Sequence, residues 1–166
     1  GFLPGPYEHR TALDEVVQYM GGLAYMTGPR GQPLRAGASV VDIMGGMFGV
    51  IGILAALRER DITGRGQKVQ SALFESTTYM MAQHMAGQVV TGEEPPPMPH
   101  KSSSWAIYET FTTADGKMIF IAITSDNHWR GFCREFKLAH LLDDPALQTN
   151  PQRVKARGRI APLVKD

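Results

Sequence analysis

The sequence predicts an α/β protein built in two parts. The apolar run from Ser39 to Leu57 predicts a long buried helix. Residues 68–73 alternate in polarity, which predicts a short strand, and residues 74–91 predict a helix directly after it. Beyond a proline-rich segment, two β-rich runs joined by the turn TADG predict a hairpin. Helices and strands therefore both contribute to the expected fold.

The order of these elements divides the chain. Residues 1–92 are expected to form an α/β part, residues 93–104 a linker, and residues 105–166 a second, α+β module that starts with the hairpin. The linker is inferred from its prolines and hydroxyl side chains, which show no helix or strand periodicity. A domain boundary is therefore expected between the methionine-containing helix and the hairpin.

The composition is that of a globular protein. The 166 residues are 43% hydrophobic and carry a net charge of +1, with acidic and basic residues interspersed. We expect a sizeable buried core and no electrostatic attraction to nucleic acid or to an anionic membrane. The single cysteine rules out an internal disulfide and is compatible with a reducing cytoplasm, where we expect the protein to reside.

Four glycines interrupt the apolar run. Gly45, Gly49 and Gly52 fall on one face of the predicted helix, and Gly46 lies beside them. Because glycine costs about 1 kcal/mol relative to alanine inside a helix, this face is interpreted as a contact surface for another backbone or an extended ligand. The 14 apolar or glycine residues of 44–57 are fewer than the roughly 20 of a membrane span, so we expect a core helix.

Asp42 has two interpretations that the local pattern leaves open. With Ser39 as the N-cap, Asp42 stands at the third helical position, where a carboxylate interacts favourably with the helix dipole by roughly 0.3 to 1 kcal/mol. Alternatively, Asp42 is a nucleophile placed where free backbone N–H groups stabilise developing negative charge. The glycine face would then admit a long, thin substrate.

Other segments predict further helices. Thr11 is expected to cap a helix that carries Asp14 in its first turn, with Val16, Val17 and Met20 as its apolar positions. The methionines of residues 74–91 are interpreted as core filling. Residues 126–138 predict an amphipathic helix with Cys133 in the core. The basic residues from Arg153 to Arg159 predict a solvated helix face or, alternatively, a surface for a phosphate or an acidic partner.

Several catalytic motifs are absent from the sequence. The five histidines never pair with one another or with Cys133 at metal-ligand spacing, so no metal site is predicted. There is no P-loop, no GxSxG turn, and no GxGxxG after a predicted strand. Nucleoside triphosphate chemistry and serine hydrolysis are both disfavoured.

Seven segments together resemble the class III CoA-transferase (CaiB/BaiF) family, which includes formyl-CoA transferase, carnitine CoA-transferase and α-methylacyl-CoA racemase. In chain order they are GPYEHR, LDEVVQYMGGLAYMTG, GQPLRAG, SVVDIMGGMFGVIGILAAL, TGRGQKVQSALFES, IYETFTTADGKMIFIA and NPQRVKARGR. The resemblance implies part of a Rossmann-like large domain followed by the start of a smaller domain, in an interlocked homodimer. Family members are more than twice as long, so the chain is expected to be a central piece.

The resemblance also implies a reaction and its residues. Asp42 would attack an acyl-CoA thioester, form a mixed anhydride and then an aspartyl-CoA thioester, and pass CoA to a small carboxylic acid. Asp14 is carried over as a second active-site acid, Gly45 and Gly46 as residues that bind CoA, and Arg10 as a residue with a CoA-binding or a structural role. Acyl-CoA is the implied substrate, and no metal is implied.

Two alternatives to the CoA-transferase function follow from the positions where this chain differs from the family and from its shorter length. The racemases carry a histidine where this chain has Leu13, so a racemase-like reaction would need a base from elsewhere, with His9 the nearest in sequence. The formyl-CoA transferases carry glycines where this chain has PPPMPHKSSS, which leaves oxalate or formate specificity open. The chain could also be a non-catalytic fragment whose helices serve only in association with other chains.

Overall fold

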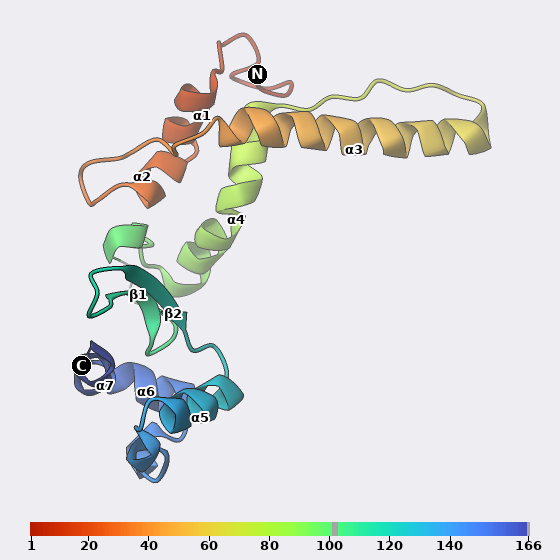
Figure 1. Cartoon of the computed structure of the whole chain (residues 1–166). Helices are drawn as coiled ribbons and strands as arrows, with labels where there is room; N and C mark the ends of the chain where they lie inside the picture. The colour runs from red at the N-terminus through yellow and green to blue at the C-terminus, as the bar shows by residue number, and fades with distance from the viewer. Residues whose placement is uncertain (101–102, 166) are drawn as a thin grey trace. The chain divides into compact units, whose positions relative to one another are not determined.

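The computed structural model describes residues 1–100 and 103–165, and the chain divides into two compact units. The units are Gly1–Lys101 and Ser102–Asp166, so the division falls within the segment predicted as a linker. Residues 101 and 102 of that segment lie outside the described residues. Among the described residues, every regular element of the first unit is helical, and the one sheet belongs to the second unit (Figure 1). The expectation of an α/β first part is therefore not met within this chain.

The first unit has four α-helices and one short 3-10 helix in its described part. They are α1 (Asp14–Met20), α2 (Leu23–Thr27), α3 (Val40–Thr63), α4 (Leu73–Thr91) and η1 (Met98–His100). Helix α4 packs against α1, α2 and α3. Its contact with α1 is close, because a Cβ on Gly21 would lie 2.3 Å from the Thr77 Cγ2 atom. A glycine is therefore needed where α1 meets α4.

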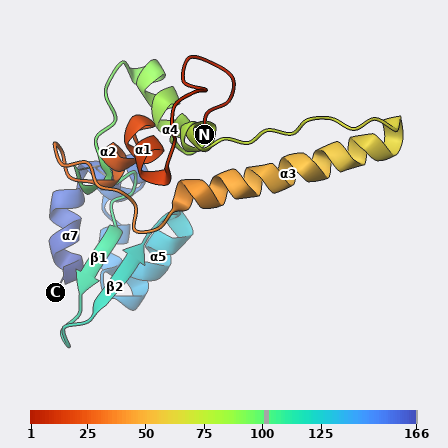
Figure 2. The ribbon, with the colours of Figure 1, turned by 90° about the horizontal axis from the view of Figure 1, so that it is seen from above.

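The strand predicted over residues 68–73 is wrong. Residues 68–72 belong to no strand and run back alongside α3 in both Figure 1 and Figure 2, and Leu73 already begins α4. An extended segment becomes a strand only when a neighbouring backbone completes its hydrogen-bond ladder. The described residues offer it no such backbone, and the Ser71 hydroxyl instead donates to the Gly45 carbonyl at 2.7 Å.

Helix α3 begins where predicted and ends at Thr63, followed by the C-cap residue Gly64, whose φ of +71° is in the left-handed region. The prediction that it is buried is wrong, since only Val41 and Gly45 are buried. The described elements cover one face of α3 and leave most of its other large apolar side chains more than half exposed. The side chains more than half exposed are Ile43, Met47, Val50, Ile51, Ile53, Leu54 and Ile62.

The length of α3 also corrects the argument from the 14-residue apolar run. The helix has 24 residues, because it continues through the charged residues after Leu57. By length and composition alone it could cross a membrane, and among the described helices it alone meets that test. Core helices of soluble proteins share these properties, so the test by itself assigns no environment.

Two other helices differ from their predictions in start or orientation. Helix α1 begins at Asp14 with Leu13 as its N-cap, rather than with Thr11. Its buried face carries Asp14, Val17 and Gln18, whereas Val16 and Met20, two of its three predicted apolar positions, are exposed. The methionines of α4 were predicted to fill a core. This holds for Met81, which is buried, but not for Met85, which is 43% exposed.

The second unit contains an antiparallel hairpin and several short helices. Strands β1 (Tyr108–Thr112) and β2 (Met118–Ala122) pair in register from Tyr108 opposite Ala122 to Thr112 opposite Met118. The predicted TADG turn is confirmed, with Gly116 at a φ of +80°. The helices are η2 (Ala139–Leu142), η3 (Pro145–Leu147), α5 (Asp126–Glu135), α6 (Asn150–Lys155) and α7 (Arg157–Lys165).

A closed apolar core joins these elements. Its buried members come from the hairpin, from α5 and from the later helices: Ala106, Ile107, Phe111, Trp129, Phe132, Cys133, Leu141, Leu147 and Ile160. The core position predicted for Cys133 is confirmed, and burial raises the pKa of its thiol to about 11.

The basic segment near the end of the chain was predicted to be a solvated helix face, and this is wrong for Arg153. Its side chain is only 4% exposed, pairs with Asp126 and lies over the Trp129 ring, with Cζ 5.3 Å from the ring centroid. The helix is interrupted at Ala156, which separates α6 from α7. Arg153 therefore ties α6 to the start of α5.

Candidate functional site

The nucleophile candidate, Asp42, lies in the first turn of α3 with its side chain exposed. Ser39 occupies the N-cap position as predicted, but its side chain makes no capping hydrogen bond. The Ser39 hydroxyl instead accepts from Arg35 Nη2 at 3.1 Å. No hydrogen bond or ion pair joins the Asp42 carboxylate to another of the described residues. The carboxylate is therefore open to a reactant.

The cap of α3 comes from Asp14, which precedes Val41 by 27 residues in the chain. Its Oδ1 atom accepts from the backbone N–H of Val41 at 2.9 Å and from that of Asp42 at 3.4 Å. The Asp14 residue is only 3% exposed. The structure thus brings Asp14 and Asp42 together, and it does so through the backbone of Asp42 rather than through two facing carboxylates.

The other oxygen of Asp14 is held by two polar side chains. Its Oδ2 atom accepts from Gln18 Nε2 at 2.6 Å and from the Arg35 guanidinium at 3.2 and 3.3 Å. Gln18 also accepts from the backbone N–H of Ala36 at 2.9 Å, so it fixes the loop that leads to α3. These contacts form one buried polar network between α1 and the start of α3.

Opposing effects set the ionisation of Asp14. Burial acts to raise the pKa of its carboxyl, but the hydrogen bonds from Val41, Gln18, Asp42 and Arg35 together hold that pKa below its ordinary value. Asp14 is therefore a carboxylate at neutral pH with both oxygens already accepting hydrogen bonds. A group in this state is poorly suited to exchange protons with a substrate.

The same contacts correct the expectation that free N–H groups surround Asp42. The N–H groups of Val41 and Asp42 donate to Asp14, and that of Val40 donates to the Ala38 carbonyl at 2.8 Å. The first N–H donors of α3 are therefore already paired. They rigidify the first turn, but they cannot serve as a ready oxyanion hole.

The glycine face of α3 is packed by the chain itself rather than left bare for a ligand. A Cβ on Gly45 would lie 3.4 Å from Leu73 Cδ1, and one on Gly52 would lie 2.8 Å from Val69 Cγ1. The contact surface predicted for this face is thus used by side chains of the segment that follows α3, where a second backbone or an extended ligand was expected. Gly46 differs, since a Cβ there would meet no atom within 4 Å and the residue is exposed. Of the two glycines predicted to bind CoA, only Gly46 has open space beside it.

The basic and histidine candidates lie in the loop before α1. Arg10 is exposed, with its guanidinium carbon 4.6 Å from the centroid of the Tyr7 ring. His9 is also exposed and lies 3.1 Å from the Glu8 carboxylate. The described contacts of these two residues are made within the loop, and none of them reaches Asp42. Leu13, at the position where the racemases carry histidine, is 58% exposed.

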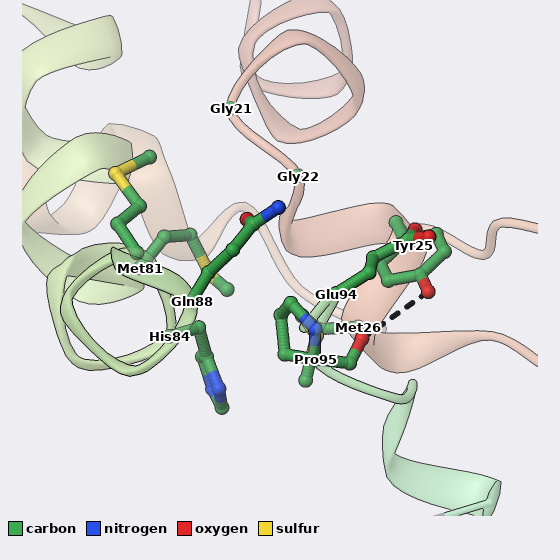
Figure 3. Close-up of a pocket in the computed structure, with 10 residues that line it drawn as sticks. Gly21, Gly22, Tyr25, Met26, Met81, His84, Gln88, Glu94 and Pro95 are labelled. Carbon is green, nitrogen blue, oxygen red and sulfur yellow. Dashed lines mark hydrogen bonds between the residues drawn. The ribbon is translucent and has the colours of Figure 1, made fainter. Parts of the chain in front are cut away.

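A separate pocket of about 190 Å³ lies between α4 and the turn from α1 to α2 (Figure 3). Met81, His84 and Gln88 line it from α4, opposite Gly22 and Tyr25. The Tyr25 hydroxyl donates to the Pro95 carbonyl at 3.2 Å, which holds the start of the predicted linker against α2. None of the predicted site residues lines this pocket.

Gln18 and Arg35 are parts of the site that the sequence analysis did not single out. The spacing of Asp14 and Gln18, four residues apart on a helix, is a signal that would have suggested their contact. Arg35 lies in the loop GQPLRAG, where no spacing to Asp14 in the sequence would have suggested their contact. Within residues 1–100 and 103–165, no three histidine, cysteine or acidic side chains lie together as a metal site.

Comparisons with known proteins agree across the whole chain. Residues 1–166 match the sequence model of CoA-transferase family III. The chain is 31% identical over 161 residues to a succinate–glutarate CoA-transferase of Agrobacterium fabrum, covering 96% of this chain and 40% of the relative. It is 30% identical over 159 residues to an acetyl-CoA:oxalate CoA-transferase of Acetobacter aceti, covering 95% and 39%.

Among solved structures, the chain resembles a CaiB/BaiF family protein from Brucella suis. The TM-score is 0.71 at 30% identity, and the match covers 97% of this chain and 43% of that protein. The chain therefore spans about two fifths of the length of the relatives it matches.

Proposed function

Because this chain belongs to CoA-transferase family III, we propose that it carries the nucleophile of an acyl-CoA:carboxylate CoA-transferase and that this nucleophile is Asp42. One observation carries the proposal. Asp42 is exposed in a turn whose backbone is pinned by Asp14, while its own carboxylate has no partner among the described residues. A fixed backbone with an open carboxylate suits covalent catalysis.

The first half of the proposed reaction moves CoA onto the protein. An oxygen of Asp42 attacks the thioester carbonyl of the acyl-CoA, the C–S bond breaks, and CoA leaves as a thiolate. The product on the protein is a mixed anhydride. The thiolate then attacks the Asp42 carbonyl of that anhydride, which releases the donor acid as a carboxylate and leaves an aspartyl-CoA thioester.

The second half repeats these steps with the acceptor. A carboxylate oxygen of the acceptor attacks the aspartyl-CoA thioester, which expels the CoA thiolate and forms a second anhydride. The thiolate attacks the acceptor's carbonyl in that anhydride, so that acyl-CoA forms and Asp42 is regenerated. One oxygen of the regenerated Asp42 comes from the acceptor. No redox partner and no metal enters this sequence.

The names of the relatives support small carboxylic acids as the substrate class. The relatives' names include succinate, glutarate and oxalate as well as acetyl-CoA. We extend the proposal to the whole protein as a cytoplasmic, interlocked homodimer with a Rossmann-like large domain. The uncovered apolar side of α3 supports the association with further protein in this proposal, because such protein must cover it if the fold is to bury its apolar surface.

The test is covalent trapping followed by mass spectrometry on the protein at its full natural length. Incubation with a panel of short acyl-CoAs and then with hydroxylamine is expected to convert Asp42 to its hydroxamate. Asp42→Asn should abolish the modification. Asp61→Asn, which changes an exposed acid near the other end of α3, is the matched control and should leave it intact. Modification that persists in Asp42→Asn would reject the proposal.

A further inference from the structure

The buried carboxylate of Asp14 pairs with the half-buried Arg35 and also accepts a hydrogen bond from the backbone of the residue proposed as nucleophile. One of its oxygens faces the N–H groups of Val41 and Asp42, and the other faces Gln18 and Arg35. The side chain is therefore divided between two tasks. One oxygen holds the first turn of α3, and the other is held in place by α1 and the preceding loop.

We infer that Asp14 is a positioning residue that fixes the turn bearing Asp42, and that it neither exchanges protons nor contacts the substrate. The inference rests on the proposed function, since it assigns Asp14 a role through Asp42. It departs from the expectation that Asp14 is a second acid lining the active site. The geometry favours anchoring, because both carboxylate oxygens of the buried Asp14 already accept hydrogen bonds from the protein and neither is free to contact a substrate.

Arg35 makes this anchor possible without leaving a buried charge uncompensated. Its guanidinium donates to Asp14 and to the Ser39 hydroxyl, and its Nε atom lies 3.2 Å from a Glu15 carboxylate oxygen. A buried carboxylate needs such a partner, because an unpaired charge away from water is strongly destabilising. Arg35 also fixes Ser39, the residue that precedes α3.

The expected consequence concerns rate rather than affinity. A displacement of about 1 Å at a reacting group can lower the rate about a hundredfold. Asp14→Ala removes both hydrogen bonds to the first turn of α3. We therefore expect the rate constant for formation of the Asp42 adduct, and kcat with it, to fall by about that factor. KM for acyl-CoA should change by no more than a few-fold, because Asp14 does not touch the substrate.

Asp14→Asn distinguishes the contact with the α3 backbone from the contact with Arg35 and Gln18. The amide oxygen can still accept from the N–H groups of Val41 and Asp42, whereas the amide nitrogen replaces the oxygen that Arg35 and Gln18 contact. We expect adduct formation in Asp14→Asn to be slower than in the wild type and several-fold faster than in Asp14→Ala. This variant also provides the measurement if Asp14→Ala does not fold.

The second unit supplies a matched control, an aspartate that also accepts from a backbone N–H through one oxygen and from an arginine through the other. Asp144 accepts from the Ala146 N–H through Oδ1 at 2.8 Å and from Arg159 through Oδ2 at 2.7 Å. Asp144→Ala therefore removes a cap and an ion pair of the same kind from a different unit. We expect it to lower thermal stability while leaving the rate of adduct formation unchanged.

The experiment is single-turnover adduct formation with a short acyl-CoA, together with steady-state kcat and KM, on the full-length protein and these variants. A loss in kcat in the order wild type, Asn, Ala at nearly constant KM supports the inference. An unchanged adduct rate in folded Asp14 variants, or a loss confined to KM, overturns it. An adduct that survives Asp42→Asn instead overturns the proposed function, and the inference falls with it.

Discussion

The two units of this chain are stabilised in different ways. The second unit surrounds a continuous apolar core in which Leu147 and Ile160 are fully buried. The first unit holds its candidate site through the polar network around Asp14 and leaves most of α3 exposed. A unit with a closed core can be stable by itself, whereas a long apolar helix with one covered face calls for additional protein.

The largest effect should come from truncating a buried leucine of the second unit, and truncating an exposed leucine of α3 should have a much smaller one. Leu147→Ala in the second unit is expected to cost about 2 to 5 kcal/mol, because it empties a fully buried site. Leu54→Ala on α3 removes a side chain that is 61% exposed and should cost less than about 0.5 kcal/mol in the 166-residue chain. Urea unfolding of both variants measures the difference.

Alkylation of Cys133 assigns the unfolding to a unit, because it is the single cysteine and is buried in the second core. It should become reactive in Leu147→Ala at lower urea than in the wild type. If Leu54→Ala proves as costly as Leu147→Ala, the exposed side of α3 is covered in solution and the contrast between the units is false.

A smaller effect should separate the packed and open glycines of α3. Gly52→Leu places a side chain against Val69 and should cost about 1 to 3 kcal/mol through overpacking. Gly46→Ala meets open space and should stabilise the helix by roughly 0.5 to 1 kcal/mol. Thermal melting compares the two variants. Equal behaviour would mean that residues 69–73 do not rest on α3.

The smallest effect is the pH dependence of the two anchored carboxylates. The pKa of Asp14 and that of Asp144 are both lowered from 3.8, chiefly through hydrogen bonds that outweigh burial. A lowered pKa means that each carboxylate contributes stability above pH 3.8, which is lost as the pH falls through the folded-state pKa. The stability gap between the wild type and either alanine variant should therefore be constant from pH 5 to 7 and shrink in stronger acid. Unfolding curves across this range measure the gap, and a gap that widens in acid would contradict the lowered pKa values.

Local features were predictable from the sequence, and long-range ones were not. The TADG turn, the amphipathic pattern around Cys133 and the placement of Asp42 in a first helical turn depend on neighbouring residues and hold in the structure. The strand over residues 68–73 failed because strand formation depends on a partner elsewhere. The expected burial of α3 failed for a related reason, since burial is decided by what covers a helix.

The candidate site shows the same limit. Proximity to a helix start suggested Ser39 as the cap of α3, yet the cap is Asp14, with Arg35 occupying the Ser39 hydroxyl. Capping rules describe residues about three positions apart in the sequence, so they cannot identify a capping carboxylate that comes from another helix. The resemblance to a family located Asp14 near the site, and only the structure gave the contacts from which its role is inferred.

The central claim is that Asp42 exchanges its own oxygen in each turnover, and isotope transfer tests it most directly. The full-length protein would be turned over with an acyl-CoA and an acceptor acid whose carboxylate carries heavy oxygen, and the peptide containing Asp42 would then be weighed. The proposed reaction predicts that one heavy oxygen enters the Asp42 carboxylate in the first turnover, that further turnovers bring in a second, and that no other side chain is labelled. Complete CoA transfer with an unlabelled Asp42 peptide would contradict the proposal.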